Sequence, residues 1–519
     1  MRLHDFFDFH AREQPDAVFA VFEGRTVTWD EARRETHRIA NALTRSGIEP
    51  GQRAAILAKN CIEYVLFYYA AAKCGVVPVP LNYRLAPPEW AGILDDAGAT
   101  FLLARGELVD AVAPLRHELS CTTTWVALDA PAPDGWTAFD DWLRDAADTA
   151  PAHTAGPADA LYQMYTSGTT GRPKGVVQTH AAVCANVDQL NAIVQVTSRD
   201  RFLIVAPLYH AAAGINLFIV IRQGGTVVIM EEFDPTAVVH ALAEQHITAT
   251  VLVPAMIQAC LVMVPEVASL DYTQLRYIAY GASPIAIETL THAMKVFACD
   301  FAQGYGMTET TAVLTALTSA DHRRALTGEP GLLLSCGKPL PGTEIRIVDA
   351  NDDDVPAGEI GEIIARGPQL MQGYWNRPEA TEQALAGGWL HTGDAGRLDA
   401  EGFLYIEDRV KDMIISGAEN IYPREVENTL FEHPAVADAA VIGVPDEKWG
   451  ETVKAVVVLR DGQNVEAEEL ITFCRNKIAH FKCPHSVDFV AELPRNPSGK
   501  VLKKDLREPY WTGRTRHVG

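Results

Sequence analysis

Residues 165–175 read Tyr-Thr-Ser-Gly-Thr-Thr-Gly-Arg-Pro-Lys-Gly. The glycines in this stretch let backbone N–H groups approach a ligand closely, because no Cβ stands in the way. Hydroxyl side chains supply hydrogen-bond donors, and Lys174 supplies a positive charge. This combination suits the phosphates of a nucleotide. The residues predicted to bind them are Thr166, Ser167, Gly168, Thr169, Thr170, Gly171 and Lys174.

The stretch does not match the P-loop pattern, in which a Gly and four further residues precede Gly-Lys-Ser or Gly-Lys-Thr. Counting onward from Gly168 or Gly171 does not reach that ending. The alternative to a nucleotide loop is a mobile surface turn rich in Ser, Thr and Gly. Motifs elsewhere in the chain must decide between the two.

Five further segments follow this loop: Tyr-Gly-Met-Thr-Glu-Thr at 305–310, Thr-Gly-Asp at 392–394, Asp-Arg-Val-Lys-Asp at 408–412, Ser-Gly-Ala-Glu-Asn-Ile-Tyr-Pro at 416–423, and Pro-Arg-Asn-Pro-Ser-Gly-Lys at 494–500. In this order they resemble the motifs of the adenylate-forming enzymes, the superfamily of acyl-CoA synthetases, luciferases and peptide-synthetase adenylation domains. The resemblance covers most of the chain. It implies ATP, Mg²⁺ and coenzyme A as cofactors or co-substrates.

Length and composition limit the class of protein. A chain of 519 residues exceeds the usual size of one core, so we expect two or more domains. Hydrophobic residues at 48% and charged residues at 21% are ordinary for a globular protein. The net charge of −23 argues against nucleic acid and anionic lipid as partners. No apolar run is long enough to span a bilayer and no export signal is visible, so we expect a cytoplasmic protein.

The nine cysteines are scattered through apolar stretches without a Cys-x-x-Cys pair, which predicts buried free thiols. The basic residues are distributed unevenly. From Arg475 to Gly519 there are ten Lys and Arg against four Asp and Glu, a local charge of +6. This tail is either an ordinary solvated face or a surface that helps to receive the polyanions ATP and coenzyme A.

Short apolar runs alternate with helical patterns through the first 330 residues, as at 53–58, 201–205, 226–230 and 248–253. That alternation predicts an α/β fold with mostly parallel sheets. Shorter strands with frequent Gly and Pro follow, which predicts a β-rich subdomain at about 330–408. The predicted organisation is a large N-terminal domain at 1–408, a hinge at 409–412 and a small α+β lid at 413–519.

The attack of a carboxylate on ATP brings two anions together, so the catalyst must supply positive charge and hydrogen-bond donors. Lys500 stands in a Pro- and Gly-rich turn, and the resemblance implies that it bridges the substrate carboxylate and a phosphate. Glu309 is predicted to hold Mg²⁺, with Thr170 as a further metal ligand. Thr308 is predicted to contact the α-phosphate. The alternative for Thr308 and Glu309 is an ordinary helix cap.

The resemblance also implies a site for the nucleoside. The adenine side of this site is predicted to comprise Gly281, Ala282, Ser283, Gly304, Tyr305, Gly306 and Met307. Relatives usually have two glycines at the start of this segment, and here a small Ala282 replaces the second. Asp394 can accept hydrogen bonds from both ribose hydroxyls, and Arg409 would reinforce that contact. An Asx turn is the alternative for Asp394.

The resemblance further implies an acyl pocket, lined by a second set of residues that includes His210 as a catalytic residue. The pocket set is Tyr209, His210, Ala211, Gly214, Val253, Pro254, Met256 and Gly281. A lone histidine is otherwise commonly a core residue. No Asp occurs between Leu208 and Phe218 to hold an α-ammonium group, so a carboxylic acid without an α-amino group is favoured.

Lys411 lies at the position of the family's hinge, about which the C-terminal lid turns between two half-reactions. The turn has a chemical reason, because Lys500 must leave before a thiol can reach the acyl carbon. The coenzyme A side of the lid is predicted to comprise Ser416, Gly417 and Ala418. Ala418 replaces a glycine that is common in that turn.

Together these features predict an ATP-dependent acyl-CoA ligase acting on medium- or long-chain fatty acids through an acyl-adenylate. One alternative is a ligase for aryl or alicyclic acids, and another is an adenylating enzyme that loads a carrier protein. A third is a catalytically silent nucleotide sensor, against which the intact Lys500, Glu309 and Asp394 argue. A homodimer is one of the oligomeric states left open.

Overall fold

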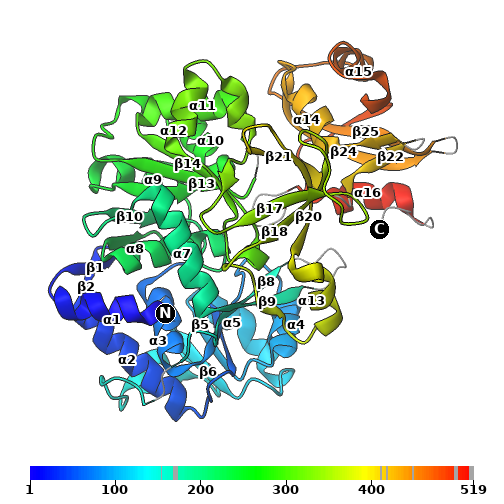
Figure 1. Cartoon of the computed structure of the whole chain (residues 1–519). Helices are drawn as coiled ribbons and strands as arrows, with labels where there is room; N and C mark the ends of the chain where they lie inside the picture. Colours follow the sequence, from blue (N-terminus) through cyan, green and yellow to red (C-terminus); the bar gives the residue numbers. More distant parts are fainter. Residues whose placement is uncertain are drawn as a thin grey trace. The chain divides into compact units, whose positions relative to one another are not determined.

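The computed structural model describes residues 1–519 except 153–154, 167–172, 284, 410–411, 417–418, 447–448, 496–500 and 513–519, and it gives no side-chain description at 408–409 and 419–420. The chain forms two compact units (Figure 1). Unit 1 contains Met1–Glu344 and Arg366–Leu390, and unit 2 contains Ile345–Ala365 and His391–Gly519. Part of the predicted N-terminal domain therefore groups with the C-terminal residues. The boundary at 408 and the hinge at 409–412 stay predictions.

Unit 1 is built on a nine-stranded sheet. Its strands in spatial order are β16 (Lys338–Pro339), β15 (Thr315–Leu317), β14 (Asp300–Tyr305), β13 (Tyr277–Gly281), β12 (Ala249–Leu252), β10 (Arg201–Ile204), β11 (Thr226–Ile229), β1 (Val18–Phe22) and β2 (Arg25–Thr28). The strands from β14 to β1 are parallel, and antiparallel strands stand at both edges. This sheet confirms the predicted α/β fold.

Two further sheets complete unit 1. A parallel sheet has the order β4 (Val77–Pro80), β3 (Arg53–Leu57), β5 (Phe101–Arg105), β6 (Thr124–Leu128) and β7 (Thr137–Ala138). An antiparallel sheet has the order β19 (Gly373–Tyr374), β9 (Lys174–Thr179) and β8 (Ala160–Thr166). The residues on either side of 167–172, Thr166 in β8 and Lys174 in β9, therefore belong to two paired antiparallel strands. A P-loop would lead from a strand into a helix. The strand pairing therefore agrees with the conclusion from the sequence that this stretch is not a P-loop.

The helices of unit 1 cover these sheets. They are α1 (Leu3–Glu13), α2 (Trp29–Arg45), α3 (Ile62–Cys74), α4 (Pro87–Ala97), α5 (Glu107–Val112), α6 (Phe139–Leu143), α7 (His180–Val194), α8 (Ala211–Gln223), α9 (Pro235–Glu244), α10 (Pro254–Met263), α11 (Ile287–Phe297), α12 (Ser319–Leu326) and α13 (Pro378–Ala384). Helix α2 begins at a capping box between Thr28 and Glu31. Helix α3 is buried on every face, as its apolar run from Tyr64 to Ala72 favours, and belongs to a core cluster with residues of both large sheets.

Unit 2 contains two sheets. One has the order β17 (Glu344–Val348), β18 (Gly361–Arg366), β20 (Leu390–Leu398) and β21 (Leu404–Arg409). The other has the order β23 (Glu419–Ile421), β22 (Ile414–Ser416), β25 (Gly450–Leu459) and β24 (Val436–Asp446), with β26 (Ser486–Phe489) parallel to β25. The helices of unit 2 are α14 (Pro423–Phe431), α15 (Ala467–Arg475) and α16 (Lys503–Trp511).

Two buried histidines face each other in unit 1. The rings of His4 and His180 lie edge to face with centroids 5.7 Å apart, and the Leu3 N–H donates to His180 Nδ1 at 3.2 Å. Burial lowers the pKa of His4 to about 4 and that of His180 to about 3. Both side chains are therefore neutral in the folded protein at neutral pH.

We expect the free energy of unfolding to fall as the pH drops from 6.5 toward 4. In that window the unfolded chain binds protons at both histidines and the folded chain does not. For His4 alone, a shift from 6.5 to about 4 amounts to about 3 kcal/mol at full protonation. Urea unfolding at several pH values measures the slope. His4→Phe should reduce the dependence of the unfolding free energy on pH, whereas the exposed His117→Gln should leave it unchanged. Equal slopes for His4→Phe and wild type would contradict the assignment of this pH dependence to His4.

All nine cysteines are free, and seven of them are buried. Cys121 and Cys299 are half-buried. Burial raises the pKa of Cys61, Cys260 and Cys299 to about 12, because a thiolate is poorly solvated there. The prediction of buried free thiols is confirmed for the seven. Among the described residues, no helix has the length and apolar character needed to cross a membrane.

Candidate functional site

Four predicted site segments follow the carboxyl ends of neighbouring parallel strands. The strand order β14, β13, β12, β10 brings together the segments that contain Tyr305, Gly281, Val253 and His210. Ligands bind at this edge of an open parallel sheet. The fold thus assembles, in unit 1, residues that the sequence leaves about a hundred positions apart.

The residues predicted to bind phosphate begin with Thr166 in β8 and end with Lys174 in β9. Thr166 pairs with Lys174, and Tyr165 pairs with Gly175. A Cβ on Gly175 would come 2.6 Å from Gln163 Nε2, so a side chain there would displace that amide. The predicted ligands Ser167, Gly168, Thr169, Thr170 and Gly171 lie outside the described residues, and their roles stay predictions. The same applies to Thr170 as a metal ligand.

Glycines at the ends of β13 and β14 allow the backbone to pack closely. Gly281 lies opposite Gly304 in the strand pairing. A Cβ on Gly281 would come 2.3 Å from the carbonyl oxygen of Gly304, and one on Gly306 would come 2.2 Å from that of Ala312. Because backbone atoms cannot swing aside as a side chain can, both positions require glycine. Their predicted contact with adenine remains untested.

Ala282 follows β13 in a left-handed backbone conformation, with φ of +67°. Such a conformation costs an L-residue with a Cβ about 1–2 kcal/mol, and glycine avoids that cost. From the sequence, Ala282 stands out only as a small residue in place of a glycine. The difference from glycine therefore lies in backbone strain as well as in size. Ser283 beside it is half-buried.

Glu309 lies in a short 3₁₀ turn, Thr308–Thr310. The carbonyl of Thr308 accepts from Gln178 Nε2 at 2.8 Å, and Met307 N–H donates to Thr310 Oγ1 at 3.0 Å. These bonds fix the turn from both sides. The turn follows Tyr305, which is buried, and the half-buried Met307.

The next residue, Thr311, is strained. It has φ of +63° and ψ of −60°, and Ala312 N–H donates to the carbonyl of Thr310 at 2.7 Å, which forms a γ-turn. This backbone geometry is rare for a β-branched residue. Thr311 is fully buried, and its Oγ1 donates to the carbonyl of Gln369 at 2.8 Å. Strain of this kind persists where the surroundings hold it, and such sites are commonly functional.

Residue Glu309 is 7% exposed, and Tyr374 Oη donates to Oε1 of its carboxylate at 2.9 Å. No Lys, Arg or His lies within ion-pair distance of it among the described residues. A buried carboxylate that meets only a neutral hydroxyl lacks compensation for its charge. The site therefore fits a bound divalent cation, for which carboxylate oxygen is a suitable ligand.

Tyr374 is a site residue that the sequence did not reveal. Its ring centroid lies 4.8 Å from Lys174 Nζ, so it contacts the loop lysine as well as Glu309. Tyr374 and Glu309 are 65 positions apart, and no motif spacing links them. Their contact depends on the pairing of β19 with β9, which brings Tyr374 opposite Val176.

His210 occupies the N-cap position of α8 without a side-chain cap hydrogen bond, and it contacts Tyr209, with ring centroids 4.3 Å apart. Burial lowers the pKa of His210 to about 4, so the imidazole is neutral at pH 7. Its Nε2, Tyr209 Oη and Tyr83 Oη are buried without a hydrogen-bond partner in the described part of the chain. The Tyr83 and Tyr209 rings lie edge to face with centroids 5.5 Å apart. A neutral His210 can orient a carboxylate by a hydrogen bond but does not attract it by charge.

The other predicted pocket residues lie at the starts of two helices. Ala211 is half-buried and Gly214 is buried, both in α8. A Cβ on Gly214 would lie 3.7 Å from Met164 Cε, an ordinary contact, so there is room for a methyl group. Pro254 is buried and begins α10, with Val253 before it and a half-buried Met256 after it. None of these contacts tests the predicted acyl pocket.

In unit 2, Asp394 lies in β20 opposite Arg409 in β21. Asp394 is 7% exposed, and its N–H donates to Thr392 Oγ1 at 3.1 Å. Gly393 has φ of +68°, which glycine adopts without strain. The strand pairing thus brings the two predicted ribose contacts to adjacent positions. Ribose binding itself stays a prediction.

The remaining predicted residues belong to the predicted hinge and lid. Ser416 is half-buried in β22 and pairs with Glu419 and Gly450. Lys411, Gly417, Ala418 and Lys500 lie outside the described residues. The assignments of hinge, coenzyme A contacts and catalytic lysine therefore stay predictions.

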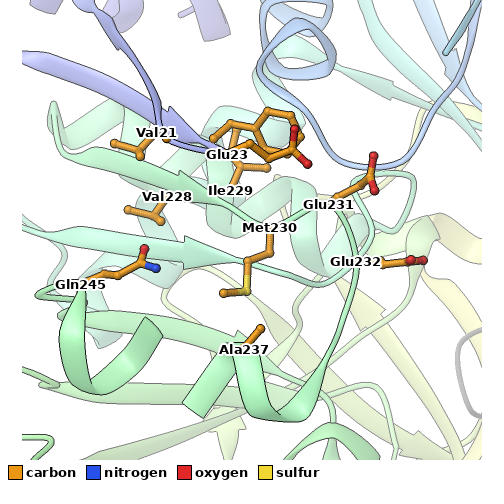
Figure 2. Close-up of a pocket in the computed structure, with 11 residues that line it drawn as sticks. Val21, Glu23, Val228, Ile229, Met230, Glu231, Glu232, Ala237 and Gln245 are labelled. Atoms are coloured by element: carbon orange, nitrogen blue, oxygen red, sulfur yellow. The ribbon is translucent and has the colours of Figure 1, made fainter. Parts of the chain in front are cut away.

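A pocket of about 320 Å³ lies beside β1 and β11 in unit 1 (Figure 2). Carboxylates of Glu23, Glu231 and Glu232 line it together with apolar side chains. Arg105 pairs with Glu231, and Lys59 lies 3.5 Å from Glu232. These acids disfavour a phosphate ligand, and none of the predicted site residues lines the pocket.

Comparison with known proteins identifies relatives along the whole chain. Residues 7–375 match the AMP-binding enzyme family, and residues 425–500 match the AMP-binding enzyme C-terminal domain. A fatty acid–[acyl-carrier-protein] ligase of Streptomyces coeruleorubidus is 38% identical, over 98% of this chain and 96% of its own. A feruloyl-CoA synthase of an Amycolatopsis species is 39% identical, over 96% of this chain and 97% of its own.

The fold has solved counterparts as well. The structure of a Mycobacterium tuberculosis fatty acyl CoA synthetase is 34% identical and superposes with a TM-score of 0.77, covering 99% of both chains. The three relatives differ in the acids and acceptors that their names give. They share the joining of an acid to a thiol-bearing acceptor.

Proposed function

The chain belongs to the family of AMP-binding enzymes, and we propose on this basis that it joins a carboxylic acid to coenzyme A at the expense of ATP. The products are acyl-CoA, AMP and pyrophosphate. The observation that carries the proposal is the buried Glu309, uncompensated by a described cation, at the sheet edge where segments predicted to bind the nucleotide follow neighbouring strands. Six family motifs in the family's order support it further.

In the first half-reaction the substrate carboxylate oxygen attacks the α-phosphorus of ATP. A new O–P bond forms, and the bond to pyrophosphate breaks. Lys174 and the loop donors bind the phosphates, Thr308 contacts the α-phosphate, and Lys500 neutralises the two anions that approach each other. Mg²⁺, when bound by Glu309, supplies positive charge to the phosphate oxygens.

In the second half-reaction the sulfur of coenzyme A attacks the acyl carbon. A C–S bond forms, the bond to AMP breaks, and the thiol proton leaves to solvent. For this step Lys500 must move away, and the proposed hinge at Lys411 gives the lid that freedom. Ser416 and its neighbours Gly417 and Ala418 would then face coenzyme A.

For the acid we propose a medium- or long-chain fatty acid. Small residues from Ala211 to Gly214 at the start of α8 would leave space for an extended chain, and the Mycobacterium tuberculosis relative supports this choice. A second candidate is an aryl acid with a polar ring substituent. It is favoured by Tyr83 Oη, Tyr209 Oη and His210 Nε2, which find no hydrogen-bond partner among the described residues and which such a substituent could satisfy.

A panel of acids tests this choice. We expect pyrophosphate release with ATP, Mg²⁺ and coenzyme A to be largest for one linear acid between acetate and palmitate. Ala211→Trp should shift that optimum toward shorter acids, because the indole would fill the pocket. Tyr209→Phe should leave linear acids unaffected.

The outcome that contradicts the fatty-acid proposal is a maximum on 4-hydroxycinnamate over cinnamate, with the difference lost in Tyr209→Phe. Loss of a hydroxyl partner changes discrimination by about tenfold or more. The carrier-protein alternative has its own readout. Transfer of a labelled acyl group to an added carrier protein, with none to coenzyme A, would replace the proposed acceptor.

A further inference from the structure

The segment 369–375 runs alongside the Glu309 turn. Thr311 Oγ1 donates to the carbonyl of Gln369 at 2.8 Å, and Met371 N–H donates to the carbonyl of Glu309 at 2.8 Å. One bond fixes the strained residue after the turn, and the other fixes the backbone of the turn itself. Through these two contacts the segment determines where the Glu309 backbone lies.

The same segment is bound to the hairpin that carries the phosphate loop. Gln372 N–H donates to the carbonyl of Val177 at 2.9 Å, and Trp375 N–H donates to the carbonyl of Gly175 at 2.7 Å. Between them, β19 pairs with β9. Segment 369–375 is therefore a common support for two parts of the site that are far apart in the sequence.

Tyr374 makes the corresponding connection through its side chain. Its N–H donates to Thr381 Oγ1 at 2.9 Å, and its Oη donates to Glu309 Oε1 at 2.9 Å. The centroid of its ring lies 4.8 Å from Lys174 Nζ. The hydroxyl occupies one carboxylate oxygen, and a hydrogen bond to a charged acceptor is strong and directional. The ring also attracts the lysine ammonium.

We propose that Tyr374 is a positioning residue. It fixes the positions of the Glu309 carboxylate and the Lys174 ammonium relative to each other, as the metal-bound triphosphate requires. The proposal rests on the proposed use of Mg²⁺ and ATP. Tyr374 touches neither reactant in this role. It acts by directing Oε2 of Glu309 toward the cation and by limiting the positions that Lys174 can take, as partners behind metal ligands commonly do.

Binding without turnover tests the role. Calorimetry with ATP alone and with ATP plus Mg²⁺, in the absence of acid and coenzyme A, measures how much Mg²⁺ raises ATP affinity. Tyr374→Phe keeps the ring on Lys174 and loses the hydroxyl, so the gain from Mg²⁺ should shrink about tenfold while Mg²⁺-free affinity holds. Tyr374→Leu should in addition lower Mg²⁺-free affinity about threefold, since the ring is lost.

The matched control is Tyr272→Phe. It removes another buried tyrosine hydroxyl, which bonds the carbonyl of Val267 at 2.8 Å in the same unit. It should behave as wild type. Tyr374→His retains a flat ring with a donor and should recover part of the Mg²⁺ response. It also serves as the second variant should thermal unfolding show that Tyr374→Phe does not fold.

Equal Mg²⁺ responses in wild type, Tyr374→Phe and Tyr374→His would overturn the role of Tyr374. A Tyr272→Phe defect equal to that of Tyr374→Phe would also overturn it, since any lost hydroxyl would then suffice. Failure of the proposed function has a different signature. In that case wild type binds ATP with Mg²⁺, but none of the acids tested supports pyrophosphate release. The ATP-binding comparison between wild type and the Tyr374 variants remains valid.

Discussion

Glu309→Gln is expected to lower acyl-adenylate formation about a hundredfold, mostly in kcat. The amide preserves the shape of the side chain and can still accept from Tyr374 Oη, but it carries no charge for a cation. Because Glu309 is nine-tenths buried, water cannot easily replace that charge. Pyrophosphate release at several Mg²⁺ concentrations measures the effect. Excess Mg²⁺ should recover only part of the rate.

The matched control is Glu63→Gln. Glu63 is 8% exposed, close to the value for Glu309, but it pairs with Arg25 away from the predicted site residues. A loss of rate at Glu63 would therefore report damage to the fold. If Glu309→Gln kept wild-type kcat and an unchanged Mg²⁺ dependence, the assignment of Glu309 to the metal would be wrong.

Lys500→Ala is expected to abolish acyl-adenylate formation while sparing thioester formation from supplied acyl-AMP. In the proposed mechanism the Lys500 ammonium acts only while two anions approach each other, and the thiol attack does not require it. We expect a loss of about a thousandfold in the first half-reaction and less than tenfold in the second. Separate assays of pyrophosphate release and of thioester yield from acyl-AMP measure the two steps.

Lys504→Ala supplies the comparison, because Lys504 is exposed and lies in the same basic tail. It removes the same charge from the tail without touching the Pro- and Gly-rich turn. Equal loss of both half-reactions in Lys500→Ala would refute the proposal that Lys500 acts only in the first of them. A similar loss in Lys504→Ala would point instead to the overall charge of the tail.

The sequence predicted the elements whose signals are local. The capping box at Thr28 and Glu31 begins α2, and Pro423 begins α14, and both signals can be read from a few neighbouring residues. The apolar runs became buried parallel strands, since only a strand covered on both faces tolerates such continuity. Because parallel strands end at one edge, the motifs that follow them could also be expected to meet.

What the sequence could not show depends on pairing between distant segments. Tyr374 reaches Glu309 only because β19 adds to β9, and a two-residue strand has no periodicity to detect. The left-handed backbone of Ala282 is likewise hidden, because alanine gives no sign of a positive φ. The composition of the sequence also does not show that the two units alternate along the chain. Residues 366–390 lie within the Gly- and Pro-rich stretch, yet they group with unit 1.

The protonated state of the cysteines bears on the proposed chemistry. An acyl-adenylate is a mixed anhydride, and a thiolate is the sulfur species that such an electrophile acylates. Burial holds the pKa of Cys61, Cys260 and Cys299 near 12, about five units above neutral pH. These sulfurs are therefore poor nucleophiles, so self-acylation at them competes weakly with the incoming thiol for the activated acyl group.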